Sequence, residues 1–346
     1  MKVQKNRLKE VAIDILKGLK ATDEEAALVA EILVQADMRG TDTHGVHLLT
    51  LLPDRVAAGM IQIPTNLKVI KEGETTTLLD GANGLGQFAV HRAMETNIKK
   101  AKKFGLGCTL VRNTNNIGSL IYYTLMAAQE GMVGVVTGNA AAAMSPWGGT
   151  EAFFGTNPIS FAAPGGKEGP VALDMSSSFV ARGKIRLAER KKERIPLGWA
   201  YDETGTETTD PTAAMKGTLV PIGGPKGYGL ALMVDILAGL LSGSKYGQGI
   251  KTFHQLVGPT GVGVFSLAID IERFMPLKQF NELIQAYLAS IKGSKKAKGV
   301  SRIYIPGERK FEKEKRSLKE GIEVSDGLAK NLNTLLEKVK SPLRLT

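Results

Sequence analysis

Residues 107–139, GCTLVRNTNNIGSLIYYTLMAAQEGMVGVVTGN, contain two short segments rich in Val, Thr and Leu, with a third segment of different character between them. The outer segments, GCTLVRN and GMVGVVTGN, are bounded by Gly and Asn, which is typical of β-strands. The segment between them, YYTLMAAQEG, is typical of a helix. Strands that alternate with helices predict an α/β or α+β domain for the middle of the chain.

Segments of the same two kinds continue on both sides of this stretch. Strand-like segments are KVIKEGETTTLLD at 68–80, NPISFAAP at 157–164, PVALDM at 170–175, GVGVFSLAID at 261–270 and RIYIPG at 302–307. Apolar spacing predicts helices within 8–19, 90–104, 228–241, 273–292 and 327–341. Thr22 with Glu25 forms a capping box that opens one more helix, ending near Gly40. Helices from both ends of the chain therefore flank a central sheet.

Composition restricts the class of protein. The 346 residues are 43% hydrophobic and 23% charged, which describes a soluble globular chain. The single cysteine, Cys108, excludes a disulfide within the chain and favours the cytoplasm. No signal peptide is expected, and the apolar stretch at 228–241 is too short to span a membrane and has Asp235 in its middle. We expect this stretch to be a buried helix, in a cytoplasmic protein with no membrane partner.

The net charge of +11 would suit an anionic partner. The lysine runs at 99–103 and 295–298 lack interleaved aromatic residues, and aromatics make up only 6% of the chain. Such runs are usually solvated faces, so we expect no nucleic-acid partner. A nucleotide-sized anion would fit the charge equally well.

Two glycine-rich stretches precede helical segments. Gly84, Gly86 and Ala89 match the pattern G-x-G-x-x-A of dinucleotide-binding turns, but the acidic residue expected about twenty positions later is missing from the segment LVRNTNN. A tight turn that leads into a helix is the alternative. The second stretch, GGPKGYG, places Lys226 among glycines before a helix, where backbone amides can approach a phosphate. A solvated lysine in a helix-opening loop is the alternative there.

Four histidines are present, and His44 has the clearest chemical potential. It lies in the polar segment RGTDTHGVHLL between two helices, where an imidazole could act as a general acid or base. A structural loop histidine is the alternative. His44 and His47 have no accompanying cluster of acids or cysteines, so no metal site is predicted.

Longer strings identify a family. Seven strings run in order over almost the whole chain: ADMRGTDTHGVHLL, GLGQFAV, WGGTEAFFGTNPISFAAP, VALDMSSSFVARGKIRLAERK, IPLGWAYDETGTETTDPTAA, GTLVPIGGPKGYGLALMVDILAGLLSG and IDIERFMPLKQF. With these strings the chain resembles the malate/L-lactate dehydrogenase family, which also contains ureidoglycolate, sulfolactate and diketogulonate oxidoreductases.

The resemblance implies hydride transfer between NAD or NADP and a small 2-hydroxy or 2-oxo acid, in an α/β fold distinct from the Rossmann type. It implies a mixed-sheet cofactor-binding domain at 71–224, and a mainly helical part at 1–70 with 225–346 that takes part in homodimerisation. It also implies a set of cofactor-binding residues: Asn139, Leu173, Asp174, Met175, Ser176, Gly224, Pro225, Lys226, Pro306, Gly307 and Glu308.

Two departures from the family pattern concern the substrate. The first family motif reads Ser-His-Gly-Val-x-Arg, with the arginine on the substrate carboxylate, whereas residues 43–48 read Thr-His-Gly-Val-His-Leu. Thr43, His47 and Leu48 are therefore the predicted substrate-binding residues. The second motif reads Asn-Ser-Asn-His, and here Asn116 replaces its histidine. His44 and Asn116 remain as catalytic candidates, either in a working oxidoreductase with a remodelled pocket or in a degenerate protein that only binds the cofactor.

Overall fold

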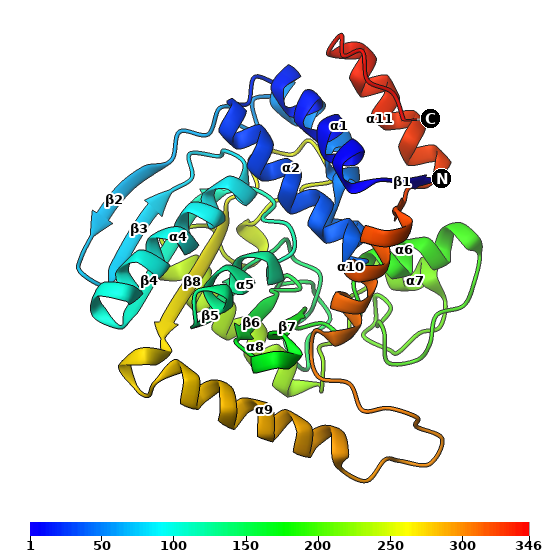
Figure 1. Ribbon diagram of the computed structural model, residues 1–346. Helices are drawn as coiled ribbons and strands as arrows, with labels where there is room; N and C mark the ends of the chain where they lie inside the picture. The colour runs from blue at the N-terminus through cyan, green and yellow to red at the C-terminus, as the bar shows by residue number, and fades with distance from the viewer. Residues whose placement is uncertain (346) are drawn as a thin grey trace.

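The computed structural model describes residues 1–345 and has a seven-stranded sheet at its centre (Figure 1). The strand order is β2-β3-β4-β8-β5-β6-β7. Only β3 and β4 pair in parallel, and the other neighbours are antiparallel. The strands are β2 (Lys68–Glu72), β3 (Thr76–Asp80), β4 (Leu106–Thr114), β5 (Met132–Gly138), β6 (Ile159–Ala163), β7 (Val171–Met175) and β8 (Val262–Asp270). This mixed sheet with surrounding helices confirms the predicted α/β class.

Small residues let helices approach both faces of the sheet. Gly107 on β4 lies against the backbone of α4 (Gly86–Phe104), and Gly134 on β5 lies against α5 (Ile121–Gln129). Both glycines are in register with Ala268 of β8, so α4 and α5 cover the same face. Gly263 of β8 points to the opposite face and lies against the carbonyl of Ala238, in a π-helical segment (Asp235–Leu240) that continues α8 (Pro225–Val234).

The two ends of the chain form a helical layer beside the sheet (Figure 1). The helices α1 (Lys5–Gly18), α2 (Asp23–Met38) and α11 (Asp326–Lys338) share one apolar core, which the short α3 (Leu52–Ala57) joins. A two-stranded antiparallel sheet of β1 (Lys2–Val3) and β9 (Ile322–Glu323) ties the ends together. The predicted capping box is confirmed, because Thr22 Oγ1 accepts from the Glu25 N–H and the Glu25 carboxylate accepts from the Thr22 N–H.

A third apolar cluster draws its buried residues from positions 143–231 of the chain. It is built on α6 (Arg182–Lys191) and α7 (Pro211–Lys216), with Leu219 bridging to both Met144 and Ala200. The remaining helices are α9 (Leu277–Gly293), which runs along the outside of the molecule, and α10 (Glu308–Glu320) (Figure 1).

Three sequence expectations were wrong. Residues 301–305 form no strand, because only Ile305 is buried there while Arg302 and Tyr304 are exposed. The segment 68–80 is a hairpin of two strands rather than one. The helix at 228–241 is not fully buried, since one side is exposed: Leu232, Met233, Ile236, Leu240 and Leu241.

The central sheet does not follow the predicted division of the chain into two parts. Strand β8 belongs to the part at 225–346 but lies between β4 and β5, so both parts of the chain contribute to the sheet. The boundaries at 70/71 and 224/225 stay predictions, and Thr346, at the end of the helical part, lies outside the described residues. Across residues 1–345 there is no helix that is long and apolar enough to cross a membrane.

Candidate active site

His44 lies in a short surface loop that follows the end of α2. The loop consists of two 3₁₀ turns, Asp42–His44 and Val46–Leu51. Below it, the buried Asp37 at the end of α2 accepts a hydrogen bond of 2.8 Å from the Val46 N–H. The carboxylate of Asp37 occupies the space that a Cβ at Gly45 would need, so only glycine fits between the two turns. Burial raises the pKa of Asp37 to about 7, the Val46 N–H opposes this shift, and Asp42 adds to it.

The imidazole of His44 is oriented by its neighbour. Thr43 Oγ1 lies 3.0 Å from His44 Nδ1, which leaves Nε2 for a substrate. Burial lowers the pKa of His44, while the negative charge of Asp174 acts in the opposite direction. His44 is therefore neutral at pH 7 and can accept a proton.

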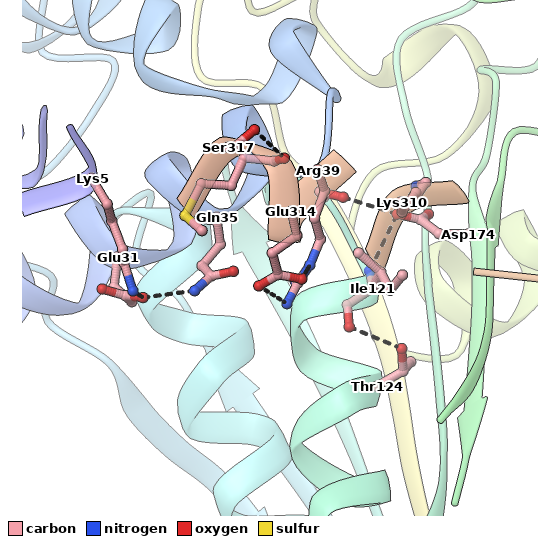
Figure 2. A network of polar contacts seen from close by, with 12 residues as sticks. Lys5, Glu31, Gln35, Arg39, Ile121, Thr124, Asp174, Lys310, Glu314 and Ser317 are labelled. Atoms are coloured by element: carbon pink, nitrogen blue, oxygen red, sulfur yellow. Dashed lines mark hydrogen bonds and ion pairs between the residues drawn. The ribbon is translucent and has the colours of Figure 1, made fainter. Parts of the chain in front are cut away.

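Asp174, at the end of β7, joins three parts of the chain. Its Oδ2 accepts hydrogen bonds from the Ser119 hydroxyl at 2.9 Å and the Ile121 N–H at 3.2 Å, and Lys310 Nζ of α10 lies 3.4 Å away (Figure 2). Asp174 was predicted as a cofactor residue. The structure places it beside the loop that follows Asn116 and close enough to His44 to affect its pKa.

Lys310 and the rest of α10 were missed by sequence reasoning. The segment ERKFEKEKRSLKE is strongly charged, and Phe311 is its one apolar side chain that packs into a core cluster, so it has too few apolar residues to mark a helix by their spacing. The helical signal that was available is the high content of Glu and Lys, which favour helix.

Leu48 and Asn116 line the same small cavity, about 10 Å³ in volume. Leu48 is only 3% exposed and belongs to the apolar core of the helical layer. Asn116 Oδ1 accepts from the Gly118 N–H at 2.9 Å. His47 is partly buried, and this burial lowers its pKa. Thr43 is exposed beside Gly183 at the start of α6.

The three segments predicted to bind the cofactor meet along β7 and the residues that follow it. The Ala172 N–H donates to Pro306 O at 3.1 Å, and Gly307 lies against the Ala172 backbone. The Ile222 N–H donates to Ser177 O at 2.9 Å, which holds the loop at 221–227 against the chain that follows Ser176. Leu173 is exposed on β7, Met175 is partly exposed, and Ser176 bonds with Ser178.

Two predicted cofactor residues are engaged elsewhere. Asn139 is 2% exposed, donates to Lys245 O and accepts from the Gly263 N–H, so a cofactor contact would have to replace one of these bonds. Glu308 pairs with Lys292 and accepts from the Ile305 N–H. Burial alone would raise the pKa of Glu308, but these two partners lower it. Glu308 thus fixes the turn at 306–308 to α9.

The residues around the loop at 221–227 fit a dinucleotide. Gly224 has φ +63° and lies against the ring of Trp147, and Pro225 and Lys226 open α8 with the lysine exposed. A cleft of about 400 Å³ adjoins this loop and is lined by Trp147, Tyr201 and Pro221 among others. Amides and a lysine at a helix N-terminus suit a pyrophosphate, and an exposed indole suits a flat ring.

The turn at 84–86 is closed to a dinucleotide. Gly84 lies against the Thr65 side chain, and Gly86 lies against the carbonyl groups of Asn115 and Asn116. Protein atoms cover the turn, so the glycines serve close packing at the start of α4. Within residues 1–345, no cluster of three or more His, Cys, Asp or Glu side chains is arranged to hold a metal ion.

Comparison with known proteins gives one consistent family. Residues 3–333 match the family model described as malate/L-lactate dehydrogenase. The chain is 40% identical to a malate dehydrogenase from Pyrococcus horikoshii, over 98% of this chain and 96% of the relative. It is 30% identical to an NAD(+)-dependent ureidoglycolate dehydrogenase from Escherichia coli, over 95% and 94%. The solved sulfolactate dehydrogenase from Methanocaldococcus jannaschii superposes with a TM-score of 0.93 at 35% identity, covering 99% and 98%.

Proposed function

The chain belongs to the malate/L-lactate dehydrogenase family, and from this premise we propose that it is a working dehydrogenase with a remodelled substrate pocket. It is an oxidoreductase that acts on CH–OH groups, and NAD or NADP is its cofactor. The proposed substrate pair is a 2-hydroxy acid and its 2-oxo acid, with a related carbonyl or imine as the wider class. The observation that carries the proposal is an imidazole held at Nδ1 by Thr43 and close enough to Asp174, at the end of β7, for the carboxylate charge to act on it.

His44 is the proposed proton-transfer residue. When bound, the nicotinamide takes or gives the hydride. Neutral His44 accepts the substrate hydroxyl proton at Nε2 during oxidation, while Thr43 holds Nδ1. The negative charge of Asp174 stabilises the imidazolium that forms. In the reverse direction, the imidazolium returns this proton to the carbonyl oxygen as hydride arrives at the carbon.

Asn116 has a supporting role in this proposal. Its Oδ1 is used by the Gly118 N–H, so its amide N–H groups are what it can offer a substrate oxygen. Leu48 lines the same small cavity with an apolar side chain. The pocket therefore differs in polarity from one with an arginine and a histidine at these positions.

The alternative is a protein that binds the cofactor without turnover. The retained arrangement of Thr43, His44 and Asp174 favours the active enzyme, because a non-catalytic protein has no need of an oriented imidazole beside a carboxylate. The test is absorbance at the reduced-nicotinamide band with NADH and NADPH and a panel of oxaloacetate, pyruvate, sulfopyruvate and cyclic imines. Tight binding of NADH without turnover of any of these would favour the alternative.

We also propose a homodimer in the cytoplasm, with its interface in the predicted helical part at 1–70 with 225–346. The terminal helices α1 and α11 bury their apolar faces within the chain and leave none for a partner. The exposed apolar side of α8 and its π-helical continuation is the better candidate, and α9 adds the exposed Leu283 and Tyr287. Light scattering of wild type and of Ile236→Asp with Leu240→Asp tests this, with a dimer expected for the first and a monomer for the second.

A further inference from the structure

Lys310 lies 3.4 Å from Asp174, and its charge acts on His44. We propose that the ammonium group of Lys310 binds the carboxylate of the 2-oxo or 2-hydroxy acid, an inference that rests on the proposed function. In such acids the carboxylate is bonded to the carbon that exchanges hydride. A group that binds it must therefore lie next to the proton-transfer residue His44.

Helix α10 is fastened to the start of the His44 loop. Arg39, which follows α2, makes two bonds to Glu314, of 2.9 and 3.2 Å. The Ser317 hydroxyl donates to Met38 O at 3.0 Å. Lys310 lies four residues before Glu314 on the same side of α10 and points toward Asp174 (Figure 2). This fixes the position of the Lys310 side chain relative to the His44 loop.

The ammonium of Lys310 has donors to spare. Its contact with Asp174 is long, at 3.4 Å, and Asp174 Oδ2 already accepts from Ser119 and Ile121. An ammonium carries three N–H donors, so at least two remain for a ligand. The Lys310 side chain is 28% exposed, which leaves it reachable from solvent. By contrast, the guanidinium of Arg39 is held by both oxygens of Glu314.

Other side chains near His44 are poorer anion partners. Leu48 is apolar and buried. His47 and His254 lie close enough to affect His44, but burial lowers the pKa of each, so both are neutral at pH 7. Lys310 acts on His44 as well, and an ammonium is a group that pairs with a carboxylate. An ammonium is a point charge without the fork geometry of a guanidinium, so this site selects an anion more strongly than a particular orientation of it.

The decisive experiment compares Lys310→Met with wild type and with the matched control Lys313→Met. Lys313 lies three residues further along α10 and points toward Glu323. We expect Lys310→Met to raise KM for oxaloacetate or pyruvate about 10- to 100-fold with kcat at saturation within threefold. It should weaken oxalate binding to the NADH complex by a similar factor in calorimetry, leave NADH affinity unchanged, and be partly rescued by Lys310→Arg. Lys313→Met should match wild type.

Other outcomes overturn the inference in distinguishable ways. Unchanged KM and unchanged oxalate affinity, in a wild type that is active, remove Lys310 from the substrate site. A shifted pH profile at unchanged KM would mean that Lys310 only changes the pKa of His44. A loss of NADH affinity would mean that Lys310 binds the cofactor instead of the substrate. A wild type that reduces no oxo acid and binds no oxalate overturns the proposed function and this inference together. If Lys310→Met fails to fold, Lys310→Gln gives the same readouts.

Discussion

The His44 loop and the cofactor segments lie next to each other but are built in different ways. The loop is held by side chains: Asp37 lies below it, Thr43 contacts the imidazole, and the Arg39–Glu314 pair joins its start to α10. The cofactor segments are held by backbone bonds such as Ile222 N–H to Ser177 O, and by glycines at positive φ. Single substitutions in the loop should therefore change the chemistry, whereas substitutions in the cofactor segments should change affinity.

The largest effect is expected for His44→Ala. Loss of the proton-transfer group should lower kcat by a factor of about 10²–10⁴. NADH affinity should stay within about twofold, because the cofactor segments are held independently of the loop. Steady-state kinetics and fluorescence titration measure the two quantities, and His91→Ala on α4 is the control, since His91 contacts Glu95 and Tyr122 instead. Full activity of His44→Ala would mean that this residue has a structural role, and that the loop does not differ from the cofactor segments in controlling the chemistry.

Next is Asp37→Asn, which tests how the loop is supported. The pKa of Asp37 is about 7 in the folded protein and about 4 when unfolded, so the folded protein binds the extra proton. This contribution to the free energy of unfolding is complete below pH 4 and is lost as the pH rises through 7, with an order of magnitude of a few kcal/mol. Asparagine keeps an acceptor for the Val46 N–H but has no such titration.

The measurement for this variant is urea unfolding between pH 4 and 9. Wild type should lose stability relative to Asp37→Asn as the pH rises, and kcat of the variant should remain within several-fold of wild type because the loop is retained. Parallel stability curves for the two proteins would contradict the burial of an ionisable carboxylate under the loop.

The two regions also differ in how far they could be predicted. The strands at 107–113, 131–139 and 170–175 and the Thr22 capping box were readable because local pattern and packing agree there. Each cofactor segment is a contiguous string, so it could be recognised in the sequence. The residues that act on His44 could not be recognised in this way, because Asp174 and Lys310 are separated by 136 residues and come together only in the fold. Helix α10 has too few apolar residues to be recognised by their spacing. RIYIPG has strand composition, and Pro306 O accepts from the Ala172 N–H of the edge strand β7, but the segment forms no ladder with that strand.

A smaller effect is expected in the cofactor segments from Gly224→Ala. The backbone of Gly224 is at φ +63°, and an added Cβ would meet the Trp147 ring at 3.0 Å. We expect strain of about 1–2 kcal/mol and NADH binding weakened about tenfold, with kcat at saturating cofactor unchanged. Gly229→Ala on the same helix is the control, since its Cβ would meet no atom within 4 Å. A loss of kcat with unchanged affinity would show that loop and cofactor segments are not separable.

The smallest effect is expected for Lys226→Ala. The side chain is exposed in the first turn of α8, where a phosphate would meet both the lysine and the helix dipole. An exposed charge contact is worth about 0.3–1 kcal/mol, so NADH affinity should fall about two- to fivefold at low salt. The difference from wild type should shrink at 0.5 M salt because the contact is screened.

The control is Lys216→Ala, because Lys216 is also an exposed lysine, at the end of α7. This variant should bind NADH like wild type at both salt concentrations. Equal affinities of Lys226→Ala and wild type at low salt would make Lys226 a solvated residue, leaving the glycine backbone as the whole of this loop's contribution.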